Sequence, residues 1–398
     1  MHKSTLKDIA FGCMILLMPV LVIATFIERI YGNRFVVGNI YHSPLFIALW
    51  GVLAISGMIY ILHTSRRYTL ISLHASLVMV LAGAAVSFCT SKRGEMTLLK
   101  DSVPASMFTT PDDRFEKLPF RLELSQIDTC YINGTETACD YKAHISISNR
   151  KNEKKRFTAS LNKPIRANGY SLCIKSISEN GLSLFVSYDP WGVPISYAGY
   201  LMTFLSFVML LFDKKSGFNS MLANRRLRVT YKGILISACI AILVLFRITT
   251  FTSDDAQPIL RTPLLSLHIS TIIVAYSLLG CCAINAIVAL CNRKEDTLAR
   301  RAVFGRILLY PATLLLMTGI FIGAIWANVS WGRYWGWDPK EVWALITLLV
   351  CSITFHTRSL PFISKARTFH IYCIALFLVM LFTYFGVNYL LSGLHSYA

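Results

Sequence analysis

The sequence holds 398 residues, of which 55% are hydrophobic and only 15% charged, with a formal net charge of +18. This composition excludes a soluble enzyme and is typical of a chain that lies largely in lipid. The Lys and Arg residues are dispersed over many loops, which argues against a nucleic-acid-binding surface.

Apolar runs long enough to cross a bilayer recur along the chain. Nine spans are expected, so the predicted fold class is an all-α polytopic membrane protein with a small β-rich external domain. The first span is expected to be an uncleaved anchor, because Pro19 is followed by further apolar residues and then charge, without a small-residue cleavage site. The expected spans are residues 9–27, 44–62, 69–88, 193–213, 233–249, 266–290, 306–327, 341–357 and 369–391.

Residues 90–190 interrupt the apolar runs and contain alternating segments such as 171–188. Alternation at period two, together with an Asn-Gly turn signal at 133–134, predicts a small β-rich domain outside the membrane. Cys130 and Cys139 flank this turn, and either a disulfide or two free thiols fit that arrangement.

Lys and Arg gather in alternate loops, which indicates the cytoplasmic side of the membrane. With nine spans, the N-terminus lies inside, whereas residues 90–190, residues 326–343 and the C-terminus lie outside. The basic loop 214–232 divides the chain into a first half, 1–215, and a second half, 216–398.

Residues 326–343, WANVSWGRYWGWDPKEVW, lie between two apolar spans and hold five of the seven tryptophans. So much indole in a short polar loop predicts a broad flat aromatic surface, which suits a planar, largely apolar ligand such as haem. A belt of interfacial tryptophans is the alternative explanation. The indoles expected to contact the ring or shape its slot are those of Trp331, Trp335, Trp337 and Trp343.

Four histidines fall into two pairs at different depths in the membrane. His268 and His395 are expected on the outer side, where each is positioned to give one axial imidazole to a haem. His74 lies about five residues inside its span, roughly 8 Å from the cytoplasmic end, and His356 ends the eighth span. Because an ionisable residue within the membrane indicates function, this pair predicts a second metal or haem site near the cytoplasm.

These residues lie in segments that resemble a known family. WGRYWGWDPKEVWALI is similar to the WWD motif of haem-handling proteins, and PLLSLHISTIIVAYSLLG and GVNYLLSGLHSYA resemble the segments that bear that family's external histidines. Residues 230–398 closely resemble CcsA (ResC), the haem-handling subunit of system II cytochrome c biogenesis. The first half resembles CcsB (ResB) through ATFIERIYG, TLISLHASLVMVLAGA and SYAGYLMTFLSFVMLLF.

The resemblance implies a CcsBA-type cytochrome c synthetase in a bacterial cytoplasmic (inner) membrane. Its bound ligand and substrate is haem b with reduced iron, which His74 and His356, and then His268 and His395, hold as axial ligands. The haem vinyl groups then join the thiols of a CxxCH motif on the outer side. The implied partners are that apocytochrome c, an external thiol reductant of the thioredoxin type and membrane lipid, with no nucleic acid.

Within the tryptophan loop, further residues receive expected roles. The catalytic candidates are Trp331, Trp335, Trp337 and Asp338. Arg333 and Lys340 are candidates to bind haem propionates, with interfacial anchoring as the alternative. Asp338 and Glu341 are expected to cap the helix that begins near Pro339 rather than to act as bases, because acidic residues in a first turn favour the helix dipole.

Two other functions use some of the same features. A haem carrier or exporter that delivers to a separate lyase needs the same ligands. A membrane di-haem electron-transfer cytochrome also explains two histidine pairs, but electron transfer needs buried haem and gives no reason for an open tryptophan-rich surface.

Overall fold

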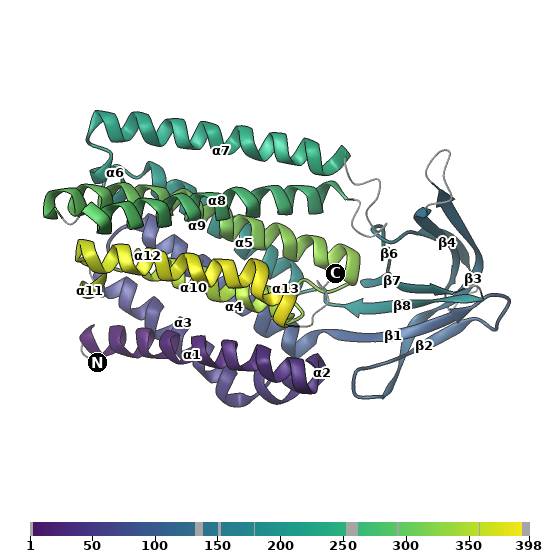
Figure 1. The fold of residues 1–398 in the computed structure, drawn as a ribbon. Helices are drawn as coiled ribbons and strands as arrows, with labels where there is room; N and C mark the ends of the chain where they lie inside the picture. Colours follow the sequence, from purple (N-terminus) through teal and green to yellow (C-terminus); the bar gives the residue numbers. More distant parts are fainter. Residues whose placement is uncertain are drawn as a thin grey trace.

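The fold consists of a bundle of long helices with an eight-stranded antiparallel sheet at one end (Figure 1). It is known from a computed structural model that describes residues 3–131, 138–149, 153–178, 180–251, 262–292, 294–357 and 359–391. This is the predicted polytopic membrane architecture with a small β-rich domain, and that prediction is confirmed.

The helices follow the apolar runs of the sequence closely. Long helices fall on eight of the expected spans and the shorter α10 on the remaining one, and short helices and two π-helical turns join or extend them. The elements are α1 (Lys3–Tyr31), α2 (Asn33–Val36), η1 (Val37–Tyr41), α3 (Pro44–Thr64), α4 (Tyr68–Thr90), α5 (Gly192–Phe212), α6 (Gly217–Met221), α7 (Arg225–Phe251), α8 (Pro263–Asn292), α9 (Glu295–Trp331), α10 (Pro339–Ile353), α11 (Pro361–Ser364), α12 (Ala366–Leu381), η4 (Phe382–Gly386) and α13 (Val387–Leu390).

Eight helices in the described part of the chain are long and apolar enough to cross a membrane. The eighth expected span, 341–357, is the shorter helix α10, with 15 residues. At 1.5 Å per residue α10 is about 22 Å long, less than the bilayer's apolar core of about 30 Å. None of its side chains is exposed, since α1, α9 and α12 pack around it. A helix enclosed by protein does not have to match the lipid thickness, so its ends are set locally.

The β-rich domain is a single antiparallel sheet with the strand order β5-β4-β3-β2-β1-β8-β7-β6. Alternate residues of all eight strands enter one continuous apolar cluster that includes Leu122, Ile145 and Leu184, so the sheet curves around its own inner face. The strands are β1 (Lys92–Leu99), β2 (Ala105–Thr109), β3 (Phe115–Tyr131), β4 (Ala138–Ser148), β5 (Lys154–Ala159), β6 (Ile165–Ala167), β7 (Tyr170–Ser178) and β8 (Gly181–Tyr188).

The cysteines expected near the tip of this sheet lie on neighbouring strands. Cys130 belongs to β3 and Cys139 to β4. The thiol of Cys130 is free, whereas the side chain of Cys139 and the turn at 133–134 lie outside the residues that the structure describes.

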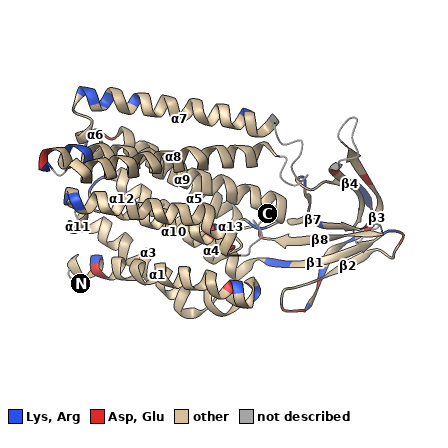
Figure 2. Ribbon diagram, viewed as in Figure 1, with Lys and Arg blue, Asp and Glu red and all other residues tan. Residues whose placement is uncertain are grey.

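Basic side chains gather at the end of the bundle that is away from the sheet. Figure 2 shows Lys and Arg at the start of α7, near the start of α9 and around α11, all at this end. The sheet therefore marks one pole of the molecule, and most of the basic helix ends mark the other.

Small residues let α4 and α5 pack closely. Gly83 lies against Ser196, Gly192 against Ser87, and Gly199 against Val80. A side-chain carbon at Gly199 would stand 2.9 Å from the backbone nitrogen of Val80, which is too close for any residue with a Cβ. Close approach of small residues is a common way for membrane helices to associate, because lipid provides no hydrophobic driving force between them.

We therefore expect Gly199→Leu to lower the apparent thermal midpoint of the purified protein in detergent, by an amount equivalent to about 1–3 kcal/mol of overpacking. Gly57→Leu on α3 is the matched control, because no atom lies within 4 Å of a Cβ at that position. Equal midpoints for the two variants would show that the α4–α5 contact is not tight.

Candidate functional site

A pair of histidines meets inside the helical bundle. His74 is on α4 and His356 follows the end of α10, and their ring centroids lie 6.3 Å apart with an interplanar angle of 89°. The Nδ1 atoms lie 2.8 Å from carbonyl oxygens one turn earlier, those of Leu70 and Ser352 respectively. Because these carbonyls accept from Nδ1–H, each ring keeps Nε2 as its unprotonated, ligand-capable nitrogen.

This spacing fits two axial ligands of one metal. An iron held between two imidazole nitrogens by bonds of about 2 Å places the ring centroids about 6 Å apart. The edge of Phe11 packs on His356 at a centroid distance of 5.4 Å, which adds an apolar wall. The structure thus brings together the two histidines that the sequence paired only by depth.

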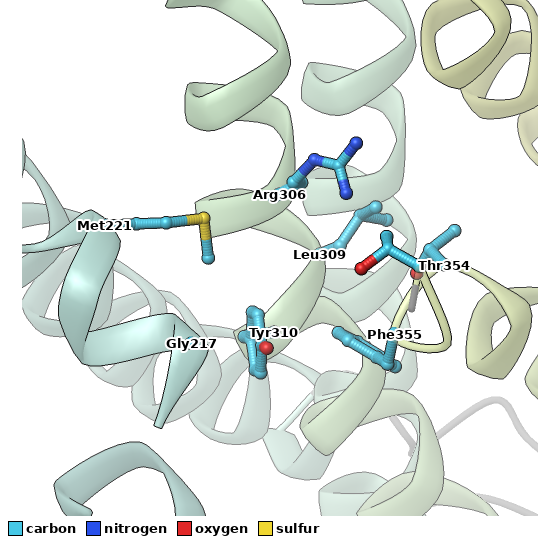
Figure 3. Close-up of a pocket in the computed structure, with 8 residues that line it drawn as sticks. Gly217, Met221, Arg306, Leu309, Tyr310, Thr354 and Phe355 are labelled. Carbon is cyan, nitrogen blue, oxygen red and sulfur yellow. The ribbon is translucent and has the colours of Figure 1, made fainter. Parts of the chain in front are cut away.

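A small cavity lies beside this pair, at the basic end of the bundle. Its volume is about 150 Å³, and Arg306 lies at one side of it, with Tyr310 and Phe355 at the other (Figure 3). Phe355 packs on Tyr310 at 4.6 Å and is the chain neighbour of His356. Since a water molecule takes up about 30 Å³ in the liquid, the cavity has room for a few waters but not for a porphyrin.

The tryptophan loop, residues 326–343, comprises the last turns of α9, the connection 332–338 and the first turns of α10, at the pole near the sheet. Gly332 ends α9 in the left-handed conformation. Asp338 caps α10 by accepting from the Lys340 amide at 3.1 Å, and Glu341 accepts from the amides of Gly336 at 2.8 Å and Asp338 at 3.2 Å. The predicted capping role of Asp338 and Glu341 is confirmed. Asp338 is only 2% exposed, so its carboxylate shapes the loop from beneath.

The indoles do not form the single flat surface that the sequence predicts. Trp335 and Trp337 are perpendicular, at an interplanar angle of 89°. Trp337 has φ +59° and stacks on Tyr41 of η1 at 4.3 Å. Trp343 is 7% exposed and donates Nε1–H to Thr25 of α1 at 3.1 Å. Trp337 and Trp343 therefore turn toward the first helices, because buried partners for their rings lie there.

His268 and Trp331 lie at the same pole. His268, near the start of α8, has Nδ1 2.7 Å from the carbonyl oxygen of Gly319 on α9. Leu265, one turn earlier on α8, packs against Trp326 and Trp331. Close approach of the imidazole to α9 requires Gly323, where a Cβ would stand 2.7 Å from the ring.

The other residues predicted for this site are His395, Arg333 and Lys340, and the structure describes only the last two. His395 lies outside the described residues, so the structure does not test its pairing with His268. The guanidinium of Arg333 curves back over its own loop, close to Gly336. Lys340 is half-buried in the first turn of α10.

Three elements of the first half hold the tryptophan loop, and sequence reasoning missed all three. From α4, the Ser87 hydroxyl accepts from the Tyr334 hydroxyl at 3.0 Å and donates to Asp189. From β7, the thiol of Cys173 donates to the Val329 carbonyl at 3.7 Å. From α1 come Thr25 and, just beyond its end, Asn33. Polar residues within apolar runs, Thr25 in the first and Ser87 in the third, were the available signal for two of the three.

Two known protein families match the sequence in separate segments. The ResB-like family matches residues 63–191, and the cytochrome C assembly protein family matches residues 200–395. One chain therefore carries a ResB-like segment followed by a segment of the cytochrome C assembly type. Their fusion in one polypeptide is the arrangement of a CcsBA-type system II protein, so the predicted resemblance is confirmed.

Individual proteins similar to this chain include NrfI and proteins named CcsA. Protein NrfI of Wolinella succinogenes is 37% identical over 150 residues, which cover 35% of this chain and 17% of NrfI. The cytochrome c biogenesis protein CcsA of Chlamydomonas reinhardtii is 34% identical over 185 residues, 42% of this chain and 50% of that protein. CcsA of Amborella trichopoda is 49% identical over 83 residues, 21% of this chain and 26% of that protein. This chain thus spans at most half the length of these relatives.

The contact between β7 and α9 predicts an unreactive thiol. Cys173 is 1% exposed, and burial raises its pKa to about 11. At pH 8 about one molecule in a thousand carries the reactive thiolate. We expect Cys173 to resist alkylation by iodoacetamide in the folded protein and to react after denaturation, as measured by mass spectrometry of its peptide.

Cys89 is the control, because it is exposed near the end of α4. Modification of Cys173 as fast as that of Cys89 in the folded protein would contradict the packing of β7 on α9.

Proposed function

We propose that this chain conveys haem across the membrane and attaches it covalently to the CxxCH thiols of apocytochrome c on the outer face. The observation that carries the proposal is the half-buried His74–His356 pair, with ring centroids 6.3 Å apart and both Nδ1 atoms bonded to carbonyl oxygens one turn earlier. Each residue comes from a different family segment, so the ligand pair needs both halves of the fused chain.

The orientation follows from the distribution of charge. Loops rich in Lys and Arg stay on the cytoplasmic side of a bacterial membrane, and most of the basic helix ends lie at the pole opposite the sheet (Figure 2). The sheet and the tryptophan loop then face outward from the inner membrane, and the His74–His356 pair lies nearer the cytoplasm. Haem b with reduced iron enters at this pair and leaves at the loop.

The outer site is built around the tryptophan loop. His268 and His395 supply the axial ligands there, and Trp331, Trp335 and Trp337 line the site with aromatic surface. Trp343 supports the loop from the buried side, where its indole is tied to Thr25. Arg333 and Lys340 supply positive charge for the propionates, and a carboxylate on a guanidinium is a strong pairing.

The reaction at this site adds a thiol across a vinyl group. The sulfur forms a bond to one vinyl carbon, and the proton goes to the other, so no electrons are gained or lost overall. Holding the thiol and the vinyl group together in the correct orientation supplies most of the rate enhancement. Both thiols of CxxCH must be reduced beforehand. An external thiol reductant of the thioredoxin type is therefore a partner in the proposed function.

The first prediction for this function concerns the outer ligands. In a cell that lacks its own maturation system, the wild-type chain yields covalent c-type haem, whereas His268→Ala and His395→Ala do not, because each variant loses one axial ligand. The measurement is haem staining of a reporter cytochrome c after denaturing electrophoresis, together with the haem content of each purified protein.

His144→Ala in the sheet is a control for loss of a histidine as such, since the His144 ring bonds to Asp128 and Thr158 of the neighbouring strands. A chain that binds haem but makes no cytochrome c, even with reductant supplied, would instead be a carrier for a separate lyase or an electron-transfer protein.

The second prediction concerns the His74–His356 pair. His74→Ala and His356→Ala should each lower the haem that copurifies with the chain by at least about tenfold. Loss of a residue that only orients a metal ligand already lowers metal affinity by about tenfold or more, and loss of the ligand itself should cost no less. Pyridine haemochrome assay of the purified protein measures this. His63→Ala, at the exposed end of α3, should leave the haem content unchanged. Unchanged haem in both His74→Ala and His356→Ala would remove the pair from the pathway.

A further inference from the structure

A carboxyl group lies buried beneath the tryptophan loop. Glu28, near the end of α1, is 5% exposed. Its Oε1 accepts from the Asn33 side-chain amide at 2.8 Å, while Oε2 has no hydrogen-bond partner among the described residues. Burying a carboxyl group that is incompletely paired costs free energy, and a chain that needed only packing here would do better with an apolar residue.

The hydrogen bonds of Glu28 continue into the loop. The Asn33 amide that donates to Glu28 also lies 3.5 Å from the carbonyl oxygen of Gly336. The amide of Gly336 in turn donates to Glu341 in the capping box of α10. The charges of Asp338, Glu341 and Arg333 also act on Glu28, so its carboxyl lies among the charged residues of the loop.

A second buried residue of the same segment fixes the orientation of an indole. Tyr41 is 2% exposed, and its ring stacks on Trp337 with an interplanar angle of 15°. Trp337 has a left-handed backbone, which costs a residue with a Cβ about 1–2 kcal/mol. Contact with Tyr41 and Phe46 offsets this cost and holds the indole in one place.

We propose that Glu28, Asn33 and Tyr41 are positioning residues for the outer haem site, because they hold Gly336 and Trp337 in the conformation that the site requires. The proposal rests on the function proposed above. These three residues precede both segments that match known families, 63–191 and 200–395. The N-terminal segment is therefore a third component of the site, which neither family match includes.

The test uses the full-length chain in membranes, with three substitutions. Glu28→Ala and Asn33→Ala remove the link between α1 and the loop, whereas Glu28→Gln keeps an acceptor for the Asn33 amide. The control is Arg29→Gln, because Arg29 is the exposed neighbour of Glu28. Each variant is measured for protein amount, for haem content and for covalent haem on the reporter cytochrome.

The expected result separates positioning from folding. Glu28→Ala and Asn33→Ala should lower the yield of covalent cytochrome c by about tenfold to 100-fold, the scale for a displacement of about 1 Å in a reacting site. Protein amount and the haem held by His74 and His356 should stay at the wild-type level. Glu28→Gln should restore most of the yield, and Arg29→Gln should behave as wild type.

A second readout does not depend on haem chemistry. Hydrogen–deuterium exchange of the loop peptide that contains Gly336 should become at least about tenfold faster in Glu28→Ala, because local opening governs exchange. Peptides of the sheet serve as the internal reference.

Three outcomes overturn the proposal: full cytochrome yield in Glu28→Ala, unchanged exchange at the loop, or a loss of yield that only follows a loss of protein. Failure of the wild-type chain to make cytochrome c would reject the proposed function instead, while exchange would still report whether Glu28 holds the loop.

Discussion

The start of α10 is the constraint on which both candidate sites depend. Asp338 and Glu341 close a capping box around the first turn, and Pro339 favours a helix beginning at that residue. From this point 15 residues lead to the turn that bears His356. Trp337 lies directly before the cap, so one short helix sets the separation between the tryptophan loop and the His74–His356 pair.

Each site is assembled from segments that lie far apart in the sequence. The histidine pair takes one ring from α4 and the other from the end of α10. The tryptophan loop is hydrogen-bonded to α1, α4 and β7, through Thr25, Ser87 and Cys173 respectively. Neither half of the chain contains a complete site, which gives a physical reason for carrying both halves in one polypeptide.

The sequence predicted correctly those features of the fold that depend on neighbouring residues alone. Hydropathy and length gave the positions of the helices, and the rise per residue gave the matching depths of His74 and His356. The prediction of a single flat surface of indoles was wrong. The orientation of the rings depends on the backbone of Trp337 and on contacts with Tyr41 and Thr25, which are distant in sequence. The length of α10 was overestimated, since hydropathy does not register that the helix ends at Ile353.

A bilayer acts on a helix through the side chains that touch lipid. None of the side chains of α10 is exposed, whereas in the most apolar stretch of α7, at the edge of the bundle (Figure 1), only 6% of residues are buried. A change in membrane thickness is therefore met by tilt of the peripheral helices. The distance between the His74–His356 pair and the tryptophan loop, which is the path of haem in the proposed function, then stays the same in membranes of different lipid composition.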